Sequence, residues 1–247
     1  MRFYISNIEA QLQGVFSFQS LEDFCLLNWA ARYYPILRCL DRHGLLSQGN
    51  ILEIGSGPVG LGTFRKVPFT GCDLSFAAPP KWPMTQLVAS AANLPIADQS
   101  FDAVVASDVL EHISPDLRAA VIHEALRVAR KLVIFGFPCG QAAHACDCAL
   151  MASYERALVE TPVWLREHML APFPEPDLFS HLPGWEVAQF GNESIGFHSW
   201  MVRKEMHRPF RLVMRACLLL APSQVEALLR KADAEPYYRQ IFVMSRS

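Results

Sequence analysis

The chain alternates short apolar runs with segments in which apolar residues recur at helical spacing. Helical spacing extends from residue 20 to 44 and stops at Gly44, which predicts two amphipathic helices broken near Pro35. Five apolar runs follow, and each has the length and composition of a buried strand. These runs are residues 50–54, 69–74, 86–89, 101–106 and 131–137, with a helical segment between the last two.

Strands that alternate with helices predict an α/β fold, Rossmann-like and doubly wound, with a mostly parallel sheet covered on both faces. Two further runs, 185–190 and 238–244, bring the expected sheet to seven strands. We expect the C-terminal strand to be antiparallel and to lie at or near the sheet edge. Residues 141–170 and 203–232 are predicted to be mainly helical insertions.

No internal repeat, low-complexity tract or flexible linker divides the chain, so residues 1–247 are expected to form a single domain. Within it we expect N-terminal helices in 1–48 and a cofactor-binding core in 49–137. Two helical segments, 138–184 and 203–232, are expected to cover the substrate.

Composition narrows the class of protein. The chain is 51% hydrophobic with a net charge of −2, so no global positive field would attract nucleic acid. Its seven cysteines are an odd number, and the N-terminus has no cleavable apolar segment, which predicts reduced thiols in the cytoplasm. No apolar run has the length of a transmembrane span.

The first predicted strand runs directly into a glycine loop, Gly55-x-Gly57-x-x-Gly60. Glycine allows the sharp turn and lets a nucleoside approach bare backbone. Asp73 ends the second strand, where a carboxylate can accept hydrogen bonds from ribose hydroxyls. These features predict a nucleotide-like cofactor, and they leave an NAD(P)-dependent oxidoreductase open as an alternative.

Two further motifs resemble those of class I S-adenosylmethionine-dependent methyltransferases, especially small-molecule enzymes related to the ubiquinone-biosynthesis methyltransferases. An acid, Glu53, precedes the glycines; residues 94–102 have the pattern Leu-Pro-x-x-x-x-x-Phe-Asp; and residues 104–112 are an apolar strand ending in Leu-Glu-His. The resemblance covers about residues 51–135. It implies S-adenosyl-L-methionine as the cofactor.

The resemblance also implies roles for individual residues. The loop would hold the methionine end, Glu53 would help to order the ammonium group, Asp73 would bind ribose and Leu74 would pack on adenine. Ser90 stands where many relatives have an acid that binds the adenine amino group, and a hydroxyl accepts that bond more weakly. The expected cofactor residues are Glu53, Gly55, Ser56, Gly57, Gly60, Asp73, Leu74, Ser90, Ala91 and Ser107.

Ligands of such sheets bind beyond the carboxyl ends of the strands, so the catalytic candidates follow the fourth and fifth strands. Asp108 and His112 share one face with Glu111 if a helix begins there, and His112 is the candidate general base. The alternatives are that His112 only packs, or that all three bind a metal, as in some quinone methyltransferases; we expect no metal. His144 is the third catalytic candidate.

Residues 144–148 form a His-x-Cys-x-Cys pattern, but no second pair completes a zinc site. Residues 208–215 carry three arginines on one helical face, and these either remain solvated or contact anionic lipid or a phosphorylated substrate: Arg208, Arg211 and Arg215. Peripheral membrane contact therefore stays an alternative.

Together these observations predict a methyltransferase acting on oxygen or nitrogen of a small-molecule or carrier-linked acceptor. Residues 164–176 weakly resemble methyltransferases of glycan synthesis, which favours a sugar or lipid-linked glycan. A catalytically silent S-adenosylmethionine-binding regulatory module is the alternative. The oligomeric state is not specified by the sequence.

Overall fold

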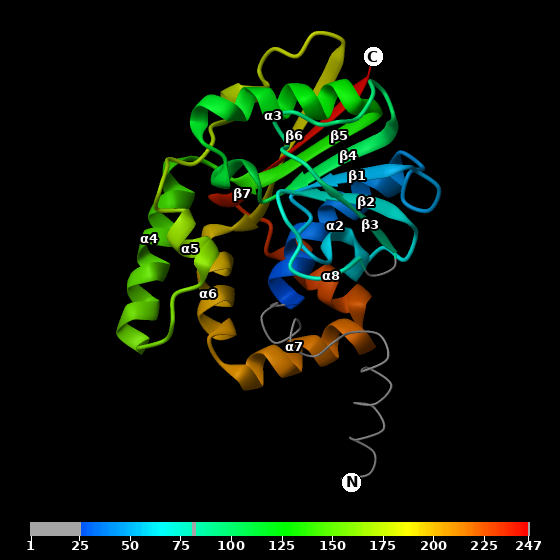
Figure 1. Cartoon of the computed structure of the whole chain (residues 1–247). Coiled ribbons are helices and arrows are strands. Elements are labelled where there is room, and N and C mark those ends of the chain that lie inside the picture. Colours follow the sequence, from blue (N-terminus) through cyan, green and yellow to red (C-terminus); the bar gives the residue numbers. More distant parts are fainter. Residues whose placement is uncertain (1–25, 81–82, 247) are drawn as a thin grey trace.

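The computed structural model describes residues 26–80 and 83–246 of the chain. A seven-stranded sheet with the order β3-β2-β1-β4-β5-β7-β6 lies at its centre (Figure 1). Its strands are β1 (Ile51–Ile54), β2 (Phe69–Asp73), β3 (Met84–Val88), β4 (Phe101–Ser107), β5 (Ala129–Pro138), β6 (Trp185–Ser194) and β7 (Tyr237–Arg246). Strands β1 to β5 are parallel, and β7 is antiparallel to both β5 and β6. The α/β fold and the antiparallel C-terminal strand are confirmed, with β7 one position inside the edge.

Alternate side chains of the strands enter two different cores. Leu52, Val104 and Val133 point to the face that helix α3 (Pro115–Val128) covers. Ile51 and Val105 point to the opposite face, against helix α2 (Leu26–Arg42). The central strands are therefore apolar on both sides, which is why they appear in the sequence as continuous apolar runs.

Helix α2 corrects one prediction. The expected break at Pro35 is wrong, because one continuous helix passes through this residue. Proline there removes a backbone hydrogen bond and strains the preceding turn, at a cost of about 3 kcal/mol. Tyr33 and Ile36, on either side of the proline, are both buried against the sheet. Burial of this face offsets the proline cost. The part of the predicted helical segment before residue 26 lies outside the described residues.

The connections in the first half of the sheet are not α-helical. Among the residues described there, the segments 55–68, 74–83 and 89–100 contain no α-helix. Only a 3-10 turn, η2 (Gly60–Thr63), follows the glycine loop. Pro79, Pro80 and Pro83 leave the second segment no room for a helix, since proline removes donors and restricts the residue before it.

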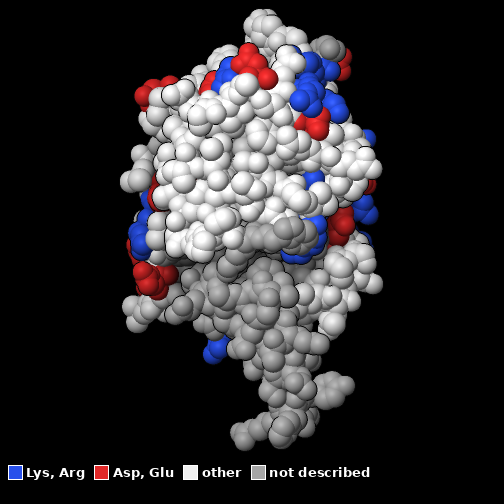
Figure 2. All heavy atoms as spheres, turned by 45° about the vertical axis from the view of Figure 1, so that its right-hand side comes forward, with Lys and Arg blue, Asp and Glu red and all other residues white. Residues whose placement is uncertain are grey.

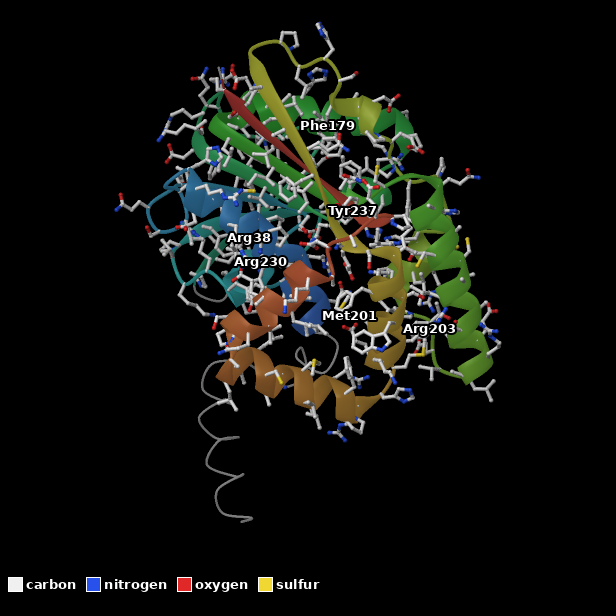
Figure 3. All side chains as sticks on the ribbon, turned by 180° about the vertical axis from the view of Figure 1, so that it is seen from behind. Arg38, Phe179, Met201, Arg203, Arg230 and Tyr237 are labelled. Atoms are coloured by element: carbon white, nitrogen blue, oxygen red, sulfur yellow. The ribbon has the colours of Figure 1, made fainter. Side chains whose placement is uncertain are left out.

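The helical insertions lie beyond the second half of the sheet. Helices α4 (Gly140–Ala157) and α5 (Val163–Glu167) and the 3-10 turn η4 (Pro176–Phe179) follow β5, and α6 (Ile195–Glu205), α7 (Arg208–Leu220) and α8 (Pro222–Lys231) connect β6 to β7. Met201 on α6 packs against α2, as Figure 3 shows from behind. No single described helix has the length and apolarity to cross a membrane; α7 and α8 meet that test only as a pair bent by 114°.

The pairing of β7 with β5 and β6 places its first residues at the end of the sheet where the parallel strands terminate. Arg239 lies opposite Pro138, near the end of β5, and opposite Asn192, near the end of β6. Because β7 is antiparallel, its first residues meet the carboxyl ends of the parallel strands. The side chains of β7 therefore join those that follow β4 and β5.

Candidate functional site

The glycine loop after β1 turns sharply at two left-handed glycines. Gly55 has φ +67° and Gly57 has φ +54°, conformations that favour glycine. A Cβ added at Gly55 would collide with Val109, whereas one added at Gly57 would meet no atom within 4 Å. The loop thus packs tightly at Gly55 and presents open space at Gly57. Bare backbone is therefore accessible on that side.

Asp73, at the end of β2, is held directly against this loop. Its Oδ2 accepts a hydrogen bond from Gly57 N at 2.9 Å, and its Oδ1 accepts from Leu74 N at 2.7 Å. Each carboxylate oxygen has capacity for a further bond, so the group can still bind a hydroxyl. The Leu74 side chain is 72% exposed beside it. Asp73 and the glycine loop, which the sequence predicts to bind one cofactor together, are therefore in direct contact.

Glu53 points away from this opening, into the core beneath the loop. Its carboxylate accepts hydrogen bonds from Tyr33 Oη at 2.6 Å and from Leu61 N at 2.7 Å. Burial raises the pKa of Glu53 to about 7, against the lowering effect of these two hydrogen bonds. A Cβ at Gly60 would collide with the Glu53 carboxylate. Glu53 therefore supports the loop from below, because its carboxylate is bonded to Tyr33 of α2 and to Leu61 of η2.

The remaining cofactor candidates lie around the loop. The Ser56 hydroxyl donates to Gly57 O at 3.0 Å. Ser90 is exposed after β3 and its Oγ accepts from Ala92 N at 3.3 Å, with Ala91 between them. Ser107 is buried at the end of β4, and its hydroxyl has no hydrogen-bond partner among the described residues.

The face beside β2 and β3 is largely uncharged. Figure 2 shows a broad area across its middle without lysine, arginine, aspartate or glutamate, and with charges gathered above and at the sides. The segment 83–97 contains no charged residue, and Val88 within it is 65% exposed. This surface suits an uncharged ligand group, and Ser90 within it is also uncharged.

Asp108 follows β4 and lies in an ion-pair cluster. Its oxygens accept from Arg239 Nε and Nη2, both at 2.7 Å, and Arg32 Nη1 is 3.3 Å away. Burial alone would raise the pKa of Asp108, but Arg239 and Arg32 outweigh it and lower that pKa to about 2. Asp108 is therefore a fixed anion, and the geometry favours a positioning role over proton transfer.

The cluster continues through Arg239 into the insertions. Arg239 Nη1 donates to Glu193 Oε2 at 2.8 Å, and Glu193 Oε1 is 3.1 Å from His198 Nδ1. Burial opposes ionisation of Glu193, but His198 and Arg239 hold its pKa below the usual value. All three side chains are buried. Polar groups from β6, β7 and α6 thus meet Asp108 beyond the sheet.

His112 follows Glu111 on the 3-10 turn η3 (Leu110–His112), and both meet His168 after α5. The His112 and His168 ring centroids are 4.9 Å apart. Burial and the neighbouring His168 lower the pKa of His112 to about 4. A neutral imidazole of this kind accepts a proton or binds a cation. Burial, and next Asp108, raise the pKa of Glu111 well above its usual value.

His144 lies near the start of α4. Its ring packs edge-on against Phe173, with centroids 5.2 Å apart, and its Nδ1 is 3.9 Å from Cys148 Sγ. Cys146 is buried against Ile195 O, whereas Cys148 is exposed. The His-x-Cys-x-Cys residues therefore do not converge, and the interpretation against zinc there agrees with this geometry.

Sequence reasoning missed Arg239 and Asp147, and it quoted His168 only as part of a motif. Arg239 carries a signal, because it is a charge within an apolar strand run. Asp147 accepts hydrogen bonds from Tyr238 Oη at 2.8 Å and lies 2.6 Å from His168 Nδ1. No local spacing predicts that contact, since the three residues come from α4, the end of α5 and β7.

The described surface also has an open hollow of about 470 Å³ where β7 begins, lined by Glu235, Pro236, Tyr237 and Gln240. Tyr237 lies opposite Ser194, the last residue of β6, and Figure 3 shows it near the start of α6. The hollow is therefore at the carboxyl-end edge of the sheet, where acceptors are expected.

Residues 52–135 match the model of a methyltransferase domain family. No curated protein matches the chain. Among solved structures, the chain is similar to a protein assigned as a sarcosine dimethylglycine methyltransferase from Galdieria sulphuraria, with 17% identity, 90% of this chain and 85% of that chain covered, and a TM-score of 0.51. It also matches a SAM-dependent methyltransferase from Archaeoglobus fulgidus, with 14% identity, coverage of 86% and 94%, and a TM-score of 0.46.

The matched segment, with the fold and the glycine loop and its acid, shows a methyltransferase domain over residues 52–135. The protein is an S-adenosylmethionine-dependent methyltransferase, and its cofactor is S-adenosyl-L-methionine. The dehydrogenase alternative and the catalytically silent module are thereby set aside.

Proposed function

We propose that the enzyme methylates an oxygen or nitrogen atom of a small-molecule or carrier-linked acceptor. The observation that carries this proposal is the open side of the loop at Gly57, directly beside the Asp73 carboxylate. When bound there, S-adenosyl-L-methionine supplies a methyl group on a positively charged sulfur, which is already an activated leaving group. The chain must then bind, orient and shield the reactants.

The cofactor residues have distinct parts in this proposal. Gly55 and Gly57 shape the loop, Ser56 fixes the peptide of Gly57, and Asp73 accepts from the ribose. Leu74 and the uncharged segment 83–97 take the base, and Glu53 braces the loop from below. The cluster beyond β4 faces the acceptor, and Asp108 positions Arg239 there.

The acceptor is covered by the helical segments 138–184 and 203–232 in this single-domain proposal. A sugar or lipid-linked glycan, and a kinship to the ubiquinone-biosynthesis enzymes, remain the finer hypotheses. The six described cysteines are all free, which supports a reducing compartment such as the cytoplasm.

The ribose role of Asp73 is tested by Asp73→Ala. Loss of hydrogen bonds to a charged acceptor is worth roughly 1.5–3 kcal/mol, so we expect affinity for S-adenosylmethionine to fall by roughly 10- to 100-fold. Titration calorimetry measures this, with Glu186→Ala, an exposed acid on β6, as the control. Unchanged affinity in Asp73→Ala contradicts the role.

The acceptor class is tested by the appearance of S-adenosylhomocysteine. Hydroxyl and amine compounds, including sugars, and also thiols and carbon nucleophiles are supplied singly to the purified enzyme with labelled methyl donor. Transfer of label to a hydroxyl or amine supports the proposal. Transfer only to a carbon or sulfur acceptor overturns it.

A further inference from the structure

Three side chains from two distant parts of the chain converge beyond the end of β4. Glu111 Oε1 lies 4.0 Å from His112 Nε2 and 3.9 Å from His168 Nε2. One donor atom from each of the three residues falls within 4.8 Å of the others. A metal ion bonded at roughly 2.0–2.2 Å holds its donors roughly 3–3.5 Å apart, so small side-chain rotations bring the three into ligation.

The Glu111 carboxyl group has no hydrogen-bond partner among the described residues. Its side chain is completely buried. Burying a carboxylate without a partner is costly, and native proteins satisfy nearly all such groups. A cation between Glu111 and the two imidazoles would supply the missing interaction.

Both imidazoles are oriented by a second carboxylate. His168 Nδ1 is 2.6 Å from Asp147 Oδ2, and His112 Nδ1 is 3.0 Å from Glu167 Oε2. A carboxylate at Nδ1 favours the tautomer with its proton there, which leaves the lone pair of Nε2 free. Both Nε2 atoms then face Glu111. Histidine ligands of metals are held in this way.

This set differs from the metal alternative considered from the sequence. That alternative used Asp108, which Arg239 and Arg32 already neutralise. The structure replaces it by His168, whose position after α5 no spacing near Glu111 reveals. Two imidazoles and one carboxylate suit zinc or another first-row transition ion better than magnesium or calcium.

We propose that Glu111, His112 and His168 bind one divalent transition-metal ion, with zinc as the reference ion. Three protein ligands leave a coordination position open. The use of this open position rests on the proposed function: if the enzyme methylates a hydroxyl, the acceptor oxygen would bind there. The hydroxyl proton then leaves to water, the oxygen–methyl bond forms as the sulfur–methyl bond breaks, and the electron pair stays on sulfur.

Metal binding is tested without cofactor or acceptor. The chelator-treated full chain is titrated with zinc chloride and, separately, magnesium chloride in a calorimeter. We expect one zinc per chain and much weaker magnesium binding. Glu111→Gln and His168→Gln should each weaken zinc binding by more than the roughly 10- to 100-fold typical of outer-sphere changes, and Asp147→Asn should fall within that range.

Two control variants isolate the site. His123→Asn removes an exposed histidine of α3, and Cys148→Ser removes the thiol beside His144, where zinc could bind instead. Neither should change zinc affinity. The proposal is overturned by absent zinc binding, by unchanged affinity in Glu111→Gln and His168→Gln, or by loss in Cys148→Ser.

Folding and cofactor binding are followed in the same variants. Circular dichroism and S-adenosylmethionine calorimetry should be unchanged in His112→Asn, a ligand at the surface with a side chain 27% exposed, while zinc affinity falls. If S-adenosylmethionine binds and zinc does not, only the metal inference fails. If zinc binds as expected and S-adenosylmethionine does not, the proposed function fails alone.

Discussion

Gly55 and Gly57 are two residues apart and have similar φ angles, yet their surroundings differ. A side chain at Gly55 meets Val109, while a side chain at Gly57 meets open space. The first glycine therefore supports the fold, and the second keeps the surface clear for a ligand.

We expect Gly55→Ala and Gly57→Ala to separate these two demands. A left-handed alanine costs roughly 1–2 kcal/mol at either site, and overpacking adds roughly 1–3 kcal/mol at Gly55. Urea unfolding should show the larger loss for Gly55→Ala. Gly57→Ala should weaken S-adenosylmethionine binding while remaining folded; equal stability losses in both variants would contradict this assignment.

Glu53 gives the protein a pH dependence whose sign follows from its pKa. The folded pKa is about 7, above the ordinary 4.5, so the folded state holds the proton more tightly than the unfolded chain does. The contribution of Glu53 to stability is then complete below pH 4.5 and is lost as the pH rises to about 7. A shift of this size corresponds to roughly 3 kcal/mol.

Glu53→Gln removes this titration. The stability difference between the variant and the natural protein should shift in favour of the variant by roughly 3 kcal/mol between pH 4.5 and pH 8. Urea unfolding at several pH values measures it, with the exposed Glu186→Gln as the control. A difference that does not vary with pH would show that Glu53 ionises normally.

At the scale of single residues, sequence reasoning located the partners that lie close in sequence or follow consecutive strands. Asp73 was predictable because parallel strands β1 and β2 must end side by side. Arg239 was not, since its contact with Asp108 depends on the insertion of an antiparallel strand between β5 and β6. The contact of Asp147 with His168 depends on how α4 packs on α5, which periodicity does not specify.

At the scale of elements, apolar periodicity identified all seven strands, but it predicted a helix break at Pro35 that does not occur. Helix α2 continues through Pro35 because tertiary packing outweighs local propensity. The short connections between β1 and β4, for which the pattern predicts no particular element, contain prolines or a 3-10 turn. Short elements such as 3-10 turns therefore contribute side chains to the hydrophobic core.

The 3-10 turn η4 shows how much such an element contributes. Phe179 is buried and stacks on Phe242, with ring centroids 4.3 Å apart, in the core that α3 also covers. Phe179→Ala should lower the free energy of unfolding by roughly 3–5 kcal/mol. Leu220→Ala, at a side chain 86% exposed on α7, should change it by less than about 0.5 kcal/mol. Urea unfolding compares them, and similar small losses would show that η4 does not belong to the core.

At the scale of the whole molecule, Arg239 ties the parallel sheet to the insertions. It is buried between Asp108 after β4 and Glu193 on β6. Removing one partner of a buried ion pair costs roughly 3–5 kcal/mol, because the other charge stays buried without compensation.

We therefore expect Arg239→Met to be strongly destabilised in urea. Adding Asp108→Asn should restore part of the loss, since the neutral side chain no longer needs a counter-charge. Circular dichroism checks that each variant folds. If Arg239→Met alone were as stable as the natural protein, the ion-pair cluster would contribute nothing to stability.

The position of β7 has a consequence for how the chain is made. β6 pairs in the sheet with β7 alone, and β7 also pairs with β5, about a hundred residues earlier. During translation β6 is synthesised before β7, its only neighbour in the described sheet. Its backbone therefore lacks a pairing strand while α6, α7 and α8 are made. Such late, long-range pairing is slow, and it exposes strand edges during translation. The nascent protein is therefore expected to depend on chaperones until β7 inserts.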